Sequence, residues 1–385
     1  MQTIYLDNNA TTQVDPEVVE AMLPFFTEKY GNPSSIHRFG GLIRRHVEQA
    51  REQVAGLIGA WPEEIYFTSC GSESDNMAIQ GFVKQHRIKS RLVTSAVEHP
   101  AVRNTCRRQK EEHGIALEEL PVDAQGLIDL EHFKSLPISP DTLVSLMWAN
   151  NETGVLFPLE EIAEWVKSRG GSVHSDAVQA VGKMPIDMST TPLDMLALSG
   201  HKLHAPKGVG ALYLRKGVKL PALLQGGHQE NGLRAGTENV AYIVGLGKAC
   251  ELAKKRIDNE NNQVRKLRDK LENALLASCK GAKLNGAKEL RLPNTTNISF
   301  EAIEGEAILL LLDENGIAAS SGSACTTGSL EPSHVMLAMG LSYTYAHSST
   351  RFSMSIFNTE EEIDKVIEVM PGIVERLRAL SPFAI

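Results

Sequence analysis

The stretch TLVSLMWANNETGVLFPLEEIAEWVKSRGGSVHSD, residues 142–176, decides the fold. Residues 142–148, TLVSLMW, are mostly apolar and predict a buried strand. Residues 158–170, PLEEIAEWVKSRG, place apolar side chains at helical spacing and end at a glycine. Residues 171–176, GSVHSD, return to a short strand pattern. A strand, a helix and a second strand in this order are typical of a parallel sheet that is covered by helices.

The same alternation recurs along the chain. Further strand-like runs occupy residues 91–97, 194–199 and 210–215. Together they predict an α/β fold with a mostly parallel sheet. Residues 251–275 form a long charged helical pattern, and TTNISF, 295–300, begins a second α+β unit. Because 385 residues also exceed what one hydrophobic core usually supports, we expect two domains with a boundary near residue 260.

Charge and hydropathy argue against several classes of partner. The net charge is −8, and no run of like charges is long enough to act as a tail for nucleic acid or an anionic membrane. The first residues, MQTIYLDNNATT, lack the basic start and apolar run of a signal peptide. The longest apolar run in the expected helices, AILLLL at 307–312, is far shorter than the roughly 20 residues that cross a bilayer. We expect a cytoplasmic protein with no nucleic-acid or membrane partner.

The five cysteines are widely spaced and include no CxxC pair. This spacing argues against a disulfide framework or a zinc site, so we expect reduced thiols and no metal. Cys250 and Cys279 lie in helical patterns and are interpreted as small buried hydrophobic residues.

Parallel sheets bind ligands at the carboxyl ends of their strands, so polar residues just after the predicted strands are the first site candidates. In FTSCGSESDNMAI, residues 67–79, a strand end meets Gly71 and Ser72 at the start of a helical pattern. Free N–H groups and the positive end of the helix dipole suit a phosphate there. A plain N-cap serine explains the same pattern at least as well.

Two more strand ends carry groups with either a chemical or a structural role. In VEHPAV, residues 97–102, His99 closes a strand before a proline. An imidazole there can stack on a flat ring or move protons, although a lone histidine is more often structural. The paired asparagines of WANNETG, residues 148–154, serve equally as turn formers.

An acid and a lysine follow the next two strands. Asp176 ends the strand at 171–176, with Gln179 three residues on. A carboxylate in this place either caps a helix or keeps a heterocyclic nitrogen protonated. In LALSGHKLHAPKGVGALYLR, residues 196–215, an apolar strand delivers Lys202 to the sheet edge, where partial desolvation makes an amine nucleophilic. A surface lysine is the usual alternative, but a lysine, an acid, an imidazole and a phosphate-type helix start together are the parts of a pyridoxal 5′-phosphate site.

Eight stretches, taken in order, resemble the class V pyridoxal phosphate enzymes, and most closely the NifS-type cysteine desulfurases associated with nitrogenase. They are YLDNNATT, GNPSSIHRFG, VEHPAV, WANNETGVLFP, SDAVQAVGK, SGHKLHAPKGVGALYLR, GGHQENGLRAGTENVA and SSGSACTTGSLEPSHV. The resemblance implies a homodimer of fold type I. Each subunit would have a mostly parallel seven-stranded sheet in a large domain, 16–260, and a smaller α+β domain, 1–15 and 261–385. It also implies that L-cysteine is converted to L-alanine and that the sulfur passes to an iron–sulfur scaffold or another acceptor protein.

The resemblance assigns roles position by position. Lys202 matches the Schiff-base lysine, Asp176 the partner of the pyridine nitrogen, and His99 the imidazole stacked on the ring. Gln179 matches the residue that bonds the phenolic oxygen, and Arg351 the fork that pairs with the substrate carboxylate. The remaining matches belong to the phosphate cradle or contact the ring and substrate, and they are Gly71, Ser72, Ser199, His201, Thr237 from the other subunit, and Asn151.

Cys325 matches the nucleophile that takes the sulfur as a persulfide. Its stretch, residues 320–335, is rich in glycine and hydroxyl residues, which gives a loop little to pack against and suits a thiol that must visit first the ring and then an acceptor. The alternative for Cys325 alone is a small hydrophobic residue in an irregular loop. The sequence departs from the family pattern at two positions. Ser72 stands where threonine is common in the family and keeps its hydroxyl group. Asn231 stands where the family usually has an arginine, which puts any charge contact of that loop in question.

The leading hypothesis is therefore a cysteine desulfurase for iron–sulfur clusters, with nitrogenase clusters as the destination. One enzyme alternative is a related β-lyase that acts on selenocysteine or cysteine sulfinate, and another is a housekeeping iron–sulfur desulfurase. A different class is a sulfur-carrying partner protein whose pyridoxal site is vestigial. Comparing the rates on cysteine, selenocysteine and cysteine sulfinate distinguishes a cysteine desulfurase from the related β-lyase. Turnover of free cysteine distinguishes it from the sulfur-carrying partner protein.

Overall fold

A seven-stranded sheet forms the middle of the computed structural model, which describes residues 3–321 and 332–381. Its strand order is β2-β8-β7-β6-β5-β3-β4. The strands are β2 (Ile65–Thr68), β3 (Arg91–Ser95), β4 (Ala116–Leu120), β5 (Thr142–Ser145), β6 (Ser172–Asp176), β7 (Met195–Ser199) and β8 (Gly210–Leu214). Only β8 pairs antiparallel with its neighbours, which confirms the prediction of a mostly parallel sheet.

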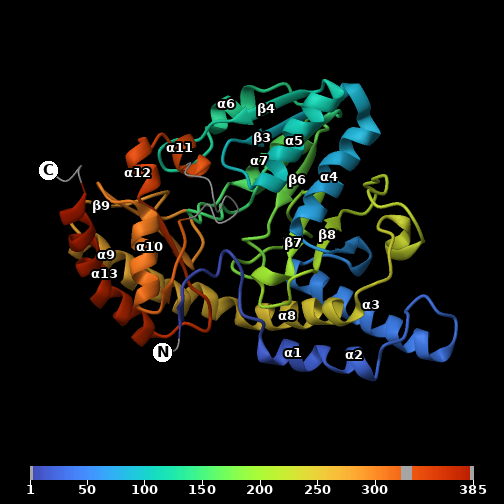
Figure 1. The fold of residues 1–385 in the computed structure, drawn as a ribbon. Coiled ribbons are helices and arrows are strands. Elements are labelled where there is room, and N and C mark those ends of the chain that lie inside the picture. The colour runs from blue at the N-terminus through green and yellow to red at the C-terminus, as the bar shows by residue number, and fades with distance from the viewer. Residues whose placement is uncertain (1–2, 322–331, 382–385) are drawn as a thin grey trace.

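Helices cover both faces of this sheet. They are α3 (Arg38–Ile58), α4 (Gly71–His86), α5 (Pro100–His113), α6 (Leu130–Ser135), α7 (Leu159–Lys167) and α8 (Val240–Asn259). Two shorter helices, α1 (Pro16–Met22) and α2 (Pro24–Thr27), pack against α8 on its outer side (Figure 1). Neighbouring residues of a strand point to opposite faces. In β5, Leu143 packs in one hydrophobic cluster with α4 and α5, whereas Val144 packs in another with α3, α7 and α8. Burial on both faces is why these strands are continuous apolar runs rather than alternating ones.

The C-terminal part is built around a three-stranded antiparallel sheet of order β12-β10-β9. Its elements are β9 (Ala282–Leu284), β10 (Thr295–Phe300), β12 (Ser349–Ser353), α9 (Arg265–Ser278), α10 (Gly305–Glu314), α11 (His334–Ala338), α12 (Tyr343–His347) and α13 (Glu360–Leu380). Figure 1 shows this part, in orange and red, beside the seven-stranded sheet, with the blue N-terminal segment running between them. The N-terminal strand β1 (Ile4–Tyr5) pairs in parallel with β11 (Ile317–Ala318).

The two parts have mostly separate hydrophobic cores. The second core joins Leu6 to residues of α9, α10, α13 and the small sheet. Residues of α11 and α12, including Val335 and Ala346, instead pack with the first core. The domain boundary at residue 260 stays a prediction.

One helical rod links the two parts. Helix α8 continues through a π-helical turn, Glu260–Val264, into α9, so the charged segment 251–275 is helical as predicted. Cys250 in α8 and Cys279 at the end of α9 are both buried, which confirms the interpretation of these two thiols. Within the described ranges, no helix combines the length and the apolar character needed to cross a membrane.

Candidate active site

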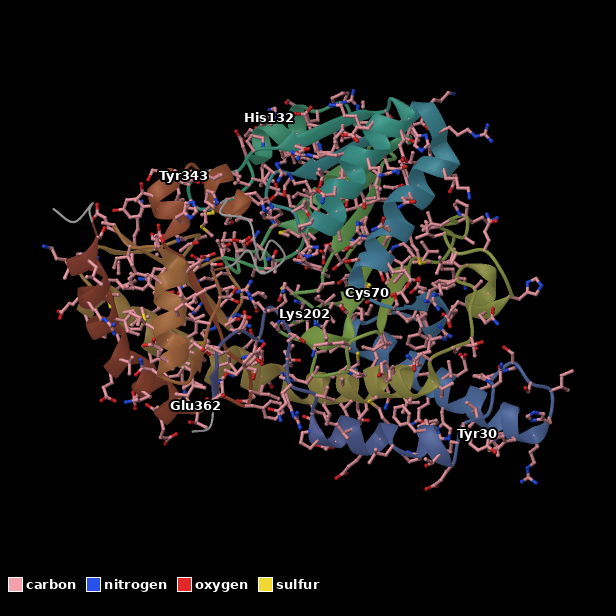
Figure 2. All side chains as sticks on the ribbon, viewed as in Figure 1. Tyr30, Cys70, His132, Lys202, Tyr343 and Glu362 are labelled. Carbon is pink, nitrogen blue, oxygen red and sulfur yellow. The ribbon has the colours of Figure 1, made fainter. Side chains whose placement is uncertain are left out.

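A pocket of ≈ 650 Å³ lies at the carboxyl ends of the parallel strands, and its volume suits a small-molecule ligand. The predicted residues that line it are Gly71, Ser72, His99, Asn151, Asp176, Gln179, Ser199, His201, Lys202 and Arg351. Figure 2 labels two lining residues, Lys202 and Cys70, near the centre of the molecule. Thr237 lines a neighbouring pocket instead, and Cys325 lies outside the described residues.

The helix start at Gly71 forms one side of the pocket. Strand β2 ends at Thr68 and α4 begins at Gly71, so the first N–H groups of α4 have no acceptor within the helix. A Cβ on Gly71 would lie 2.6 Å from Cγ2 of Val178, so a glycine is required where the helix start approaches this loop. Close by, Ser199 has a buried hydroxyl without a hydrogen-bond partner among the described residues. Free N–H groups and an unsatisfied hydroxyl are what an oxyanion would complete.

The charges around this cradle also favour an anion. Glu73, in the first turn of α4, is paired with Arg234 at 2.8 Å and also accepts a hydrogen bond from the N–H of Ser69. The negative charge of Glu73 is thus neutralised by Arg234 and does not repel an anionic ligand. Burial and then the charges of Lys202 and Lys207 lower the pKa of His201 to about 4. His201 is therefore neutral at physiological pH and meets a ligand as a ring N–H or a lone pair.

Two carboxyl groups lie at the floor of the pocket. Asp176 ends β6 and accepts a hydrogen bond from the N–H of Val178 at 3.0 Å. Burial raises its pKa, while the charges of His99 and Lys202 oppose the rise. Asp75 on α4 is also buried, and burial and then the charge of Asp176 raise its pKa well above the ordinary value. We therefore place the proton on Asp75 and the negative charge on Asp176.

Asp75 was missed by sequence reasoning. Its Oδ1 lies 3.5 Å from Nε2 of His174, whose pKa burial lowers to about 3, so this ring is neutral. The Nδ1 of His174 is in turn hydrogen-bonded to the hydroxyl of Ser145 at 2.9 Å. The only sign of this role in the sequence is an acidic residue at a helix position that faces the sheet. Nothing in the sequence indicates that Asp75 lies close to Asp176.

Lys202 ends a short 3-10 turn that follows β7. Its Nζ donates hydrogen bonds to the backbone carbonyl of Asn9 and, at 2.8 Å, to that of Ala10. The side-chain Nε2 of Gln179 donates to the same Asn9 carbonyl at 2.9 Å. Asn9 and Ala10 are thus site residues that sequence reasoning missed. The motif YLDNNATT carries no local sign that it lies against a strand end near residue 199.

His99 is the N-cap of α5. Its Nδ1 accepts a hydrogen bond from the N–H of Ala101 at 3.1 Å. The proton of the neutral ring therefore lies on Nε2. The imidazole is fixed in its tautomer by the helix that it caps.

Arg351 brings the small sheet into the site. Only 1% of it is exposed, its Nη2 donates to Asp7 at 2.6 Å, and its Nη1 donates to the carbonyl of Asn151 at 2.8 Å. Just before the undescribed segment 322–331, Ser320 pairs with the Arg351 backbone. Just after it, Ser333 donates a hydrogen bond to Glu152 at 2.5 Å. One described flank of the segment that contains Cys325 is thus held by the pocket residue Arg351, and the other by Glu152, the neighbour of the pocket residue Asn151.

No metal centre accompanies these groups: in residues 3–321 and 332–381, no three His, Cys, Asp or Glu side chains are grouped to hold a metal ion. The four described cysteines, Cys70, Cys106, Cys250 and Cys279, form no disulfide with one another. The chemistry available in the pocket is that of an amine, a carboxylate, an imidazole and an anion cradle.

Comparison with known proteins gives consistent matches over the whole length. The family model described as aminotransferase class-V matches residues 4–366. A protein named cysteine desulfurase from Trichormus azollae is 58% identical over 383 residues, covering 100% of this chain and 96% of the relative. The cysteine desulfurase NifS of Azotobacter vinelandii is 56% identical over 384 residues, covering 100% and 95%. A solved structure described as a NifS-like protein is 39% identical and superposes with a TM-score of 0.91, covering 98% of this chain and 100% of the other.

Proposed function

The chain belongs to the aminotransferase class-V family, and from this premise we propose that it is a cysteine desulfurase, which takes sulfur from L-cysteine and leaves L-alanine. The observation that carries the proposal is the convergence of Lys202, Asp176, His99 and Arg351 on one pocket. An amine, a buried anion, an imidazole and a guanidinium in one place are the groups that amino-acid chemistry with an aldehyde cofactor needs.

The residues present fit pyridoxal 5′-phosphate. The helix start at Gly71 and Ser72, with the unsatisfied hydroxyl of Ser199, offers donors to a phosphate, and His201 lies beside them. The buried carboxylate of Asp176 would keep the pyridine nitrogen protonated, which also satisfies that carboxylate. When bound, this group supplies an electron sink for the substrate's α-carbon.

The chain's own residues bind and orient the substrate. Arg351 presents a planar fork to the carboxylate of L-cysteine, with Asn151 next to it. His99, whose Nδ1 accepts a hydrogen bond and thus leaves Nε2 to carry a proton, is placed to pass that proton at the ring face. Lys202 is the amine that would hold the cofactor's aldehyde, and its nitrogen would hold or return a proton beside the substrate.

Cys325 completes the reaction in this proposal. Its thiolate attacks the sulfur of bound L-cysteine, and an S–S bond forms as the substrate's Cβ–S bond breaks. The electron pair of the broken bond stays with Cβ, which takes a proton and becomes the methyl group of L-alanine. The persulfide on Cys325 then passes to an acceptor protein, for which we propose an iron–sulfur scaffold, with nitrogenase clusters as the destination suggested by the NifS relative.

We also propose that the active form is a homodimer in which Thr237 completes the phosphate cradle of the other subunit. In this chain Thr237 lines a separate pocket, so a second copy is the simplest way to bring it to a cradle. The mass of the cofactor-loaded protein in solution tests this association.

The experiment is to load the purified protein with pyridoxal 5′-phosphate, add L-cysteine, and measure L-alanine together with persulfide on the protein. The wild type should form both products, and Cys325→Ser should keep the cofactor's spectral response to L-cysteine while losing the persulfide. Cys70→Ala is the matched control, because its thiol also lines the pocket and should not be needed. Faster turnover of selenocysteine or cysteine sulfinate, with Cys325 dispensable, would contradict the proposal in favour of a related β-lyase.

A further inference from the structure

A second buried lysine, Lys183, lies behind the active site. It is 5% exposed, and it lines a small cavity of ≈ 40 Å³ whose wall also includes Lys202. Its Nζ donates hydrogen bonds to the backbone carbonyl of Gln179 at 3.2 Å and to the side-chain Oε1 of Gln179 at 3.1 Å. No role in the proposed reaction uses this amine, yet it contacts a residue that does line the active-site pocket.

Two contacts decide which way the Gln179 amide points, that of Lys183 with Oε1 and that of the Asn9 carbonyl with Nε2. An amide has one acceptor end and one donor end of nearly equal shape. A protonated lysine carries only donors, so it selects Oε1, and Nε2 is left for the opposite side. There Nε2 uses one N–H on the carbonyl of Asn9 at 2.9 Å, and its second N–H is the group available to a ligand.

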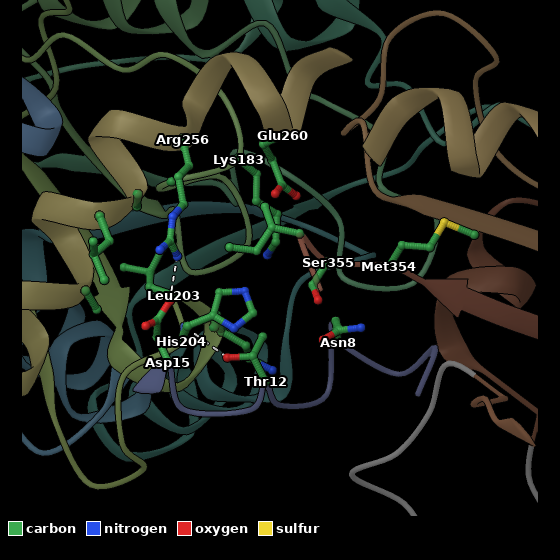
Figure 3. Close-up of a pocket in the computed structure, with 16 residues that line it drawn as sticks. Asn8, Thr12, Asp15, Lys183, Leu203, His204, Arg256, Glu260, Met354 and Ser355 are labelled. Carbon is green, nitrogen blue, oxygen red and sulfur yellow. Dashed lines mark hydrogen bonds and ion pairs between the residues drawn. The ribbon is translucent and has the colours of Figure 1, made fainter. Parts of the chain in front are cut away.

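A carboxylate from the linking helix balances the charge of Lys183. Glu260 begins the π-helical turn between α8 and α9, is 7% exposed, and lines the same cavity, as Figure 3 shows. The next residue of the turn, Asn261, donates a hydrogen bond to the backbone carbonyl of Lys183 at 3.3 Å. The irregular turn thus places two of its side chains against the loop that carries Lys183, as π-helical turns often do near functional sites.

The protonation states of this pair are compatible with the contact. Burial lowers the pKa of Lys183 to about 8 and raises that of Glu260 to about 7, and the opposite charge of each partner counteracts its shift. In the charged form the amine faces the two carbonyl oxygens of Gln179 with N–H groups alone, and this is the form that selects Oε1.

We propose that Lys183, with Glu260 as its counter-charge, is a positioning residue that locks the Gln179 amide with its N–H toward the active site. The proposal deepens the proposed function and rests on it, because it takes the phenolic oxygen of pyridoxal 5′-phosphate as the acceptor of the Gln179 N–H. In the loaded enzyme that oxygen would lie beside the nitrogen of Lys202, and the two groups would compete for one proton. A donated N–H stabilises the oxygen as an anion and so lowers the pKa of the shared proton.

The test is a pH titration of the cofactor absorbance in the loaded enzyme. Lys183→Met should let the amide turn its carbonyl toward the ring oxygen, so the apparent pKa of the absorbance change should rise by about one unit, the equivalent of one hydrogen bond. Lys254→Met is the matched control, because Lys254 donates a hydrogen bond to the backbone carbonyl of Gly56 at 2.7 Å and does not line the active-site pocket, so its loss should leave the titration near that of the wild type. A Lys183→Met enzyme that titrates like the wild type would overturn the proposal.

A double-mutant cycle separates positioning from simple loss of a positive charge. Gln179→Leu should raise the apparent pKa by a similar amount, and adding Lys183→Met to it should produce no further rise. A further rise of equal size would mean that Lys183 acts through its charge, and the proposal would fail. Because methionine leaves Glu260 buried without its counter-charge, the pair Lys183→Met and Glu260→Gln is measured as well and should show the same shift.

The outcomes also separate this proposal from the proposed function. If the wild-type chain never takes up pyridoxal 5′-phosphate, both fail together. If the wild type binds the cofactor and turns over L-cysteine but the titration is insensitive to residue 183, only the positioning role fails.

Discussion

The active-site pocket has two walls of different origin. The sheet wall consists of residues at the ends of β6 and β7, chiefly Asp176, Ser199 and Lys202. The far wall consists of Asn9 and Arg351, which come from the N-terminal segment and from β12. The sheet wall is a consequence of strand direction and needs no distant partner. The far wall depends on contacts between distant parts of the chain, among them the ion pair of Asp7 with Arg351, 344 positions apart. The comparison teaches that groups for cofactor chemistry can be placed by one sheet, whereas the group for substrate selection depends on the contact between two cores.

Lys202→Ala breaks the sheet wall and has the largest expected effect. Without this amine the cofactor has no covalent anchor and the site loses an acid–base group, so turnover of L-cysteine should fall by at least about 10²- to 10⁴-fold. The measurement is the absorbance spectrum of the loaded protein together with the rate of L-alanine formation. Lys207→Ala, an exposed lysine of the same pocket, should keep both. Normal colour and rate in Lys202→Ala would place the anchor on another amine.

Arg351→Lys tests the far wall. Lysine keeps the charge but loses the planar fork, so the KM for L-cysteine should rise roughly 10- to 100-fold while the cofactor spectrum stays unchanged. Arg291→Lys is the matched control, because Arg291 is also a buried arginine and pairs with Glu272 at 2.6 Å away from the pocket. It should destabilise the fold without changing KM. Equal KM values in the two variants would remove Arg351 from substrate binding.

Glu98→Gln tests how the stability of the region beside the pocket residue His99 depends on pH. Glu98 lies next to His99, and burial raises its pKa to about 8 even though it accepts hydrogen bonds from Met147 and Ser95. Between its ordinary value of 4.5 and about 8, the folded state keeps a proton that the unfolded state has lost. The stabilisation is therefore complete at low pH and is lost as pH rises through the folded pKa. From about pH 5 to 8, the wild type should lose roughly 3 kcal/mol of unfolding free energy relative to Glu98→Gln.

Chemical denaturation at several pH values measures this difference. Glu272→Gln provides a control of opposite sign: burial alone would raise the pKa of Glu272, but hydrogen bonds from Arg291 and Thr296 and the charges of Arg291 and Arg268 lower it. Its contribution is present above the unfolded pKa and is lost as pH falls. Parallel pH curves for wild type and Glu98→Gln would show that Glu98 is ionised in the folded protein.

Ser199→Ala has the smallest expected effect and probes the anion cradle alone. Since the hydroxyl of Ser199 is buried without a partner among the described residues, its removal should change the stability of the cofactor-free protein by less than about 0.5 kcal/mol. The affinity for pyridoxal 5′-phosphate should fall roughly five- to tenfold, the equivalent of one hydrogen bond. Ser175→Ala is the matched control, because its hydroxyl is equally buried and unpaired but does not line the pocket. Equal affinities in the two variants would contradict a role for Ser199 in the cradle.

The sheet and its wall could be predicted because their rules are local. Apolar runs with helices between them determine a parallel sheet, and a parallel sheet brings the ends of its strands to one edge. Asp176 and Lys202 therefore converge without any knowledge of side-chain packing. The antiparallel strand β8 was predicted as a strand but not in its direction, because a run such as GALYL has the same pattern in either orientation.

The far wall could not be predicted from the residues themselves. Asn9 is 1% exposed, donates to Thr295 and Asn151, and accepts from Asn294, but an asparagine near the start of a chain gives no sign of such partners. Arg351 was identified only through a family resemblance, and Asp7 was not identified at all. Asp75 was missed for a related reason, since its raised pKa depends on burial and on the charge of Asp176 rather than on its neighbours in sequence.

The hydrogen bonds between the N-terminal segment and β12 also determine when, during translation, the contacts around Lys202 can form. Asn8 and Asn9 are translated more than 340 residues before Ser353, yet they are held by the carbonyl and hydroxyl of that residue. The large sheet can be complete while these partners are still inside the exit tunnel. The carbonyls of Asn9 and Ala10 that surround Lys202 can therefore be fixed in place only after residue 353 has been translated.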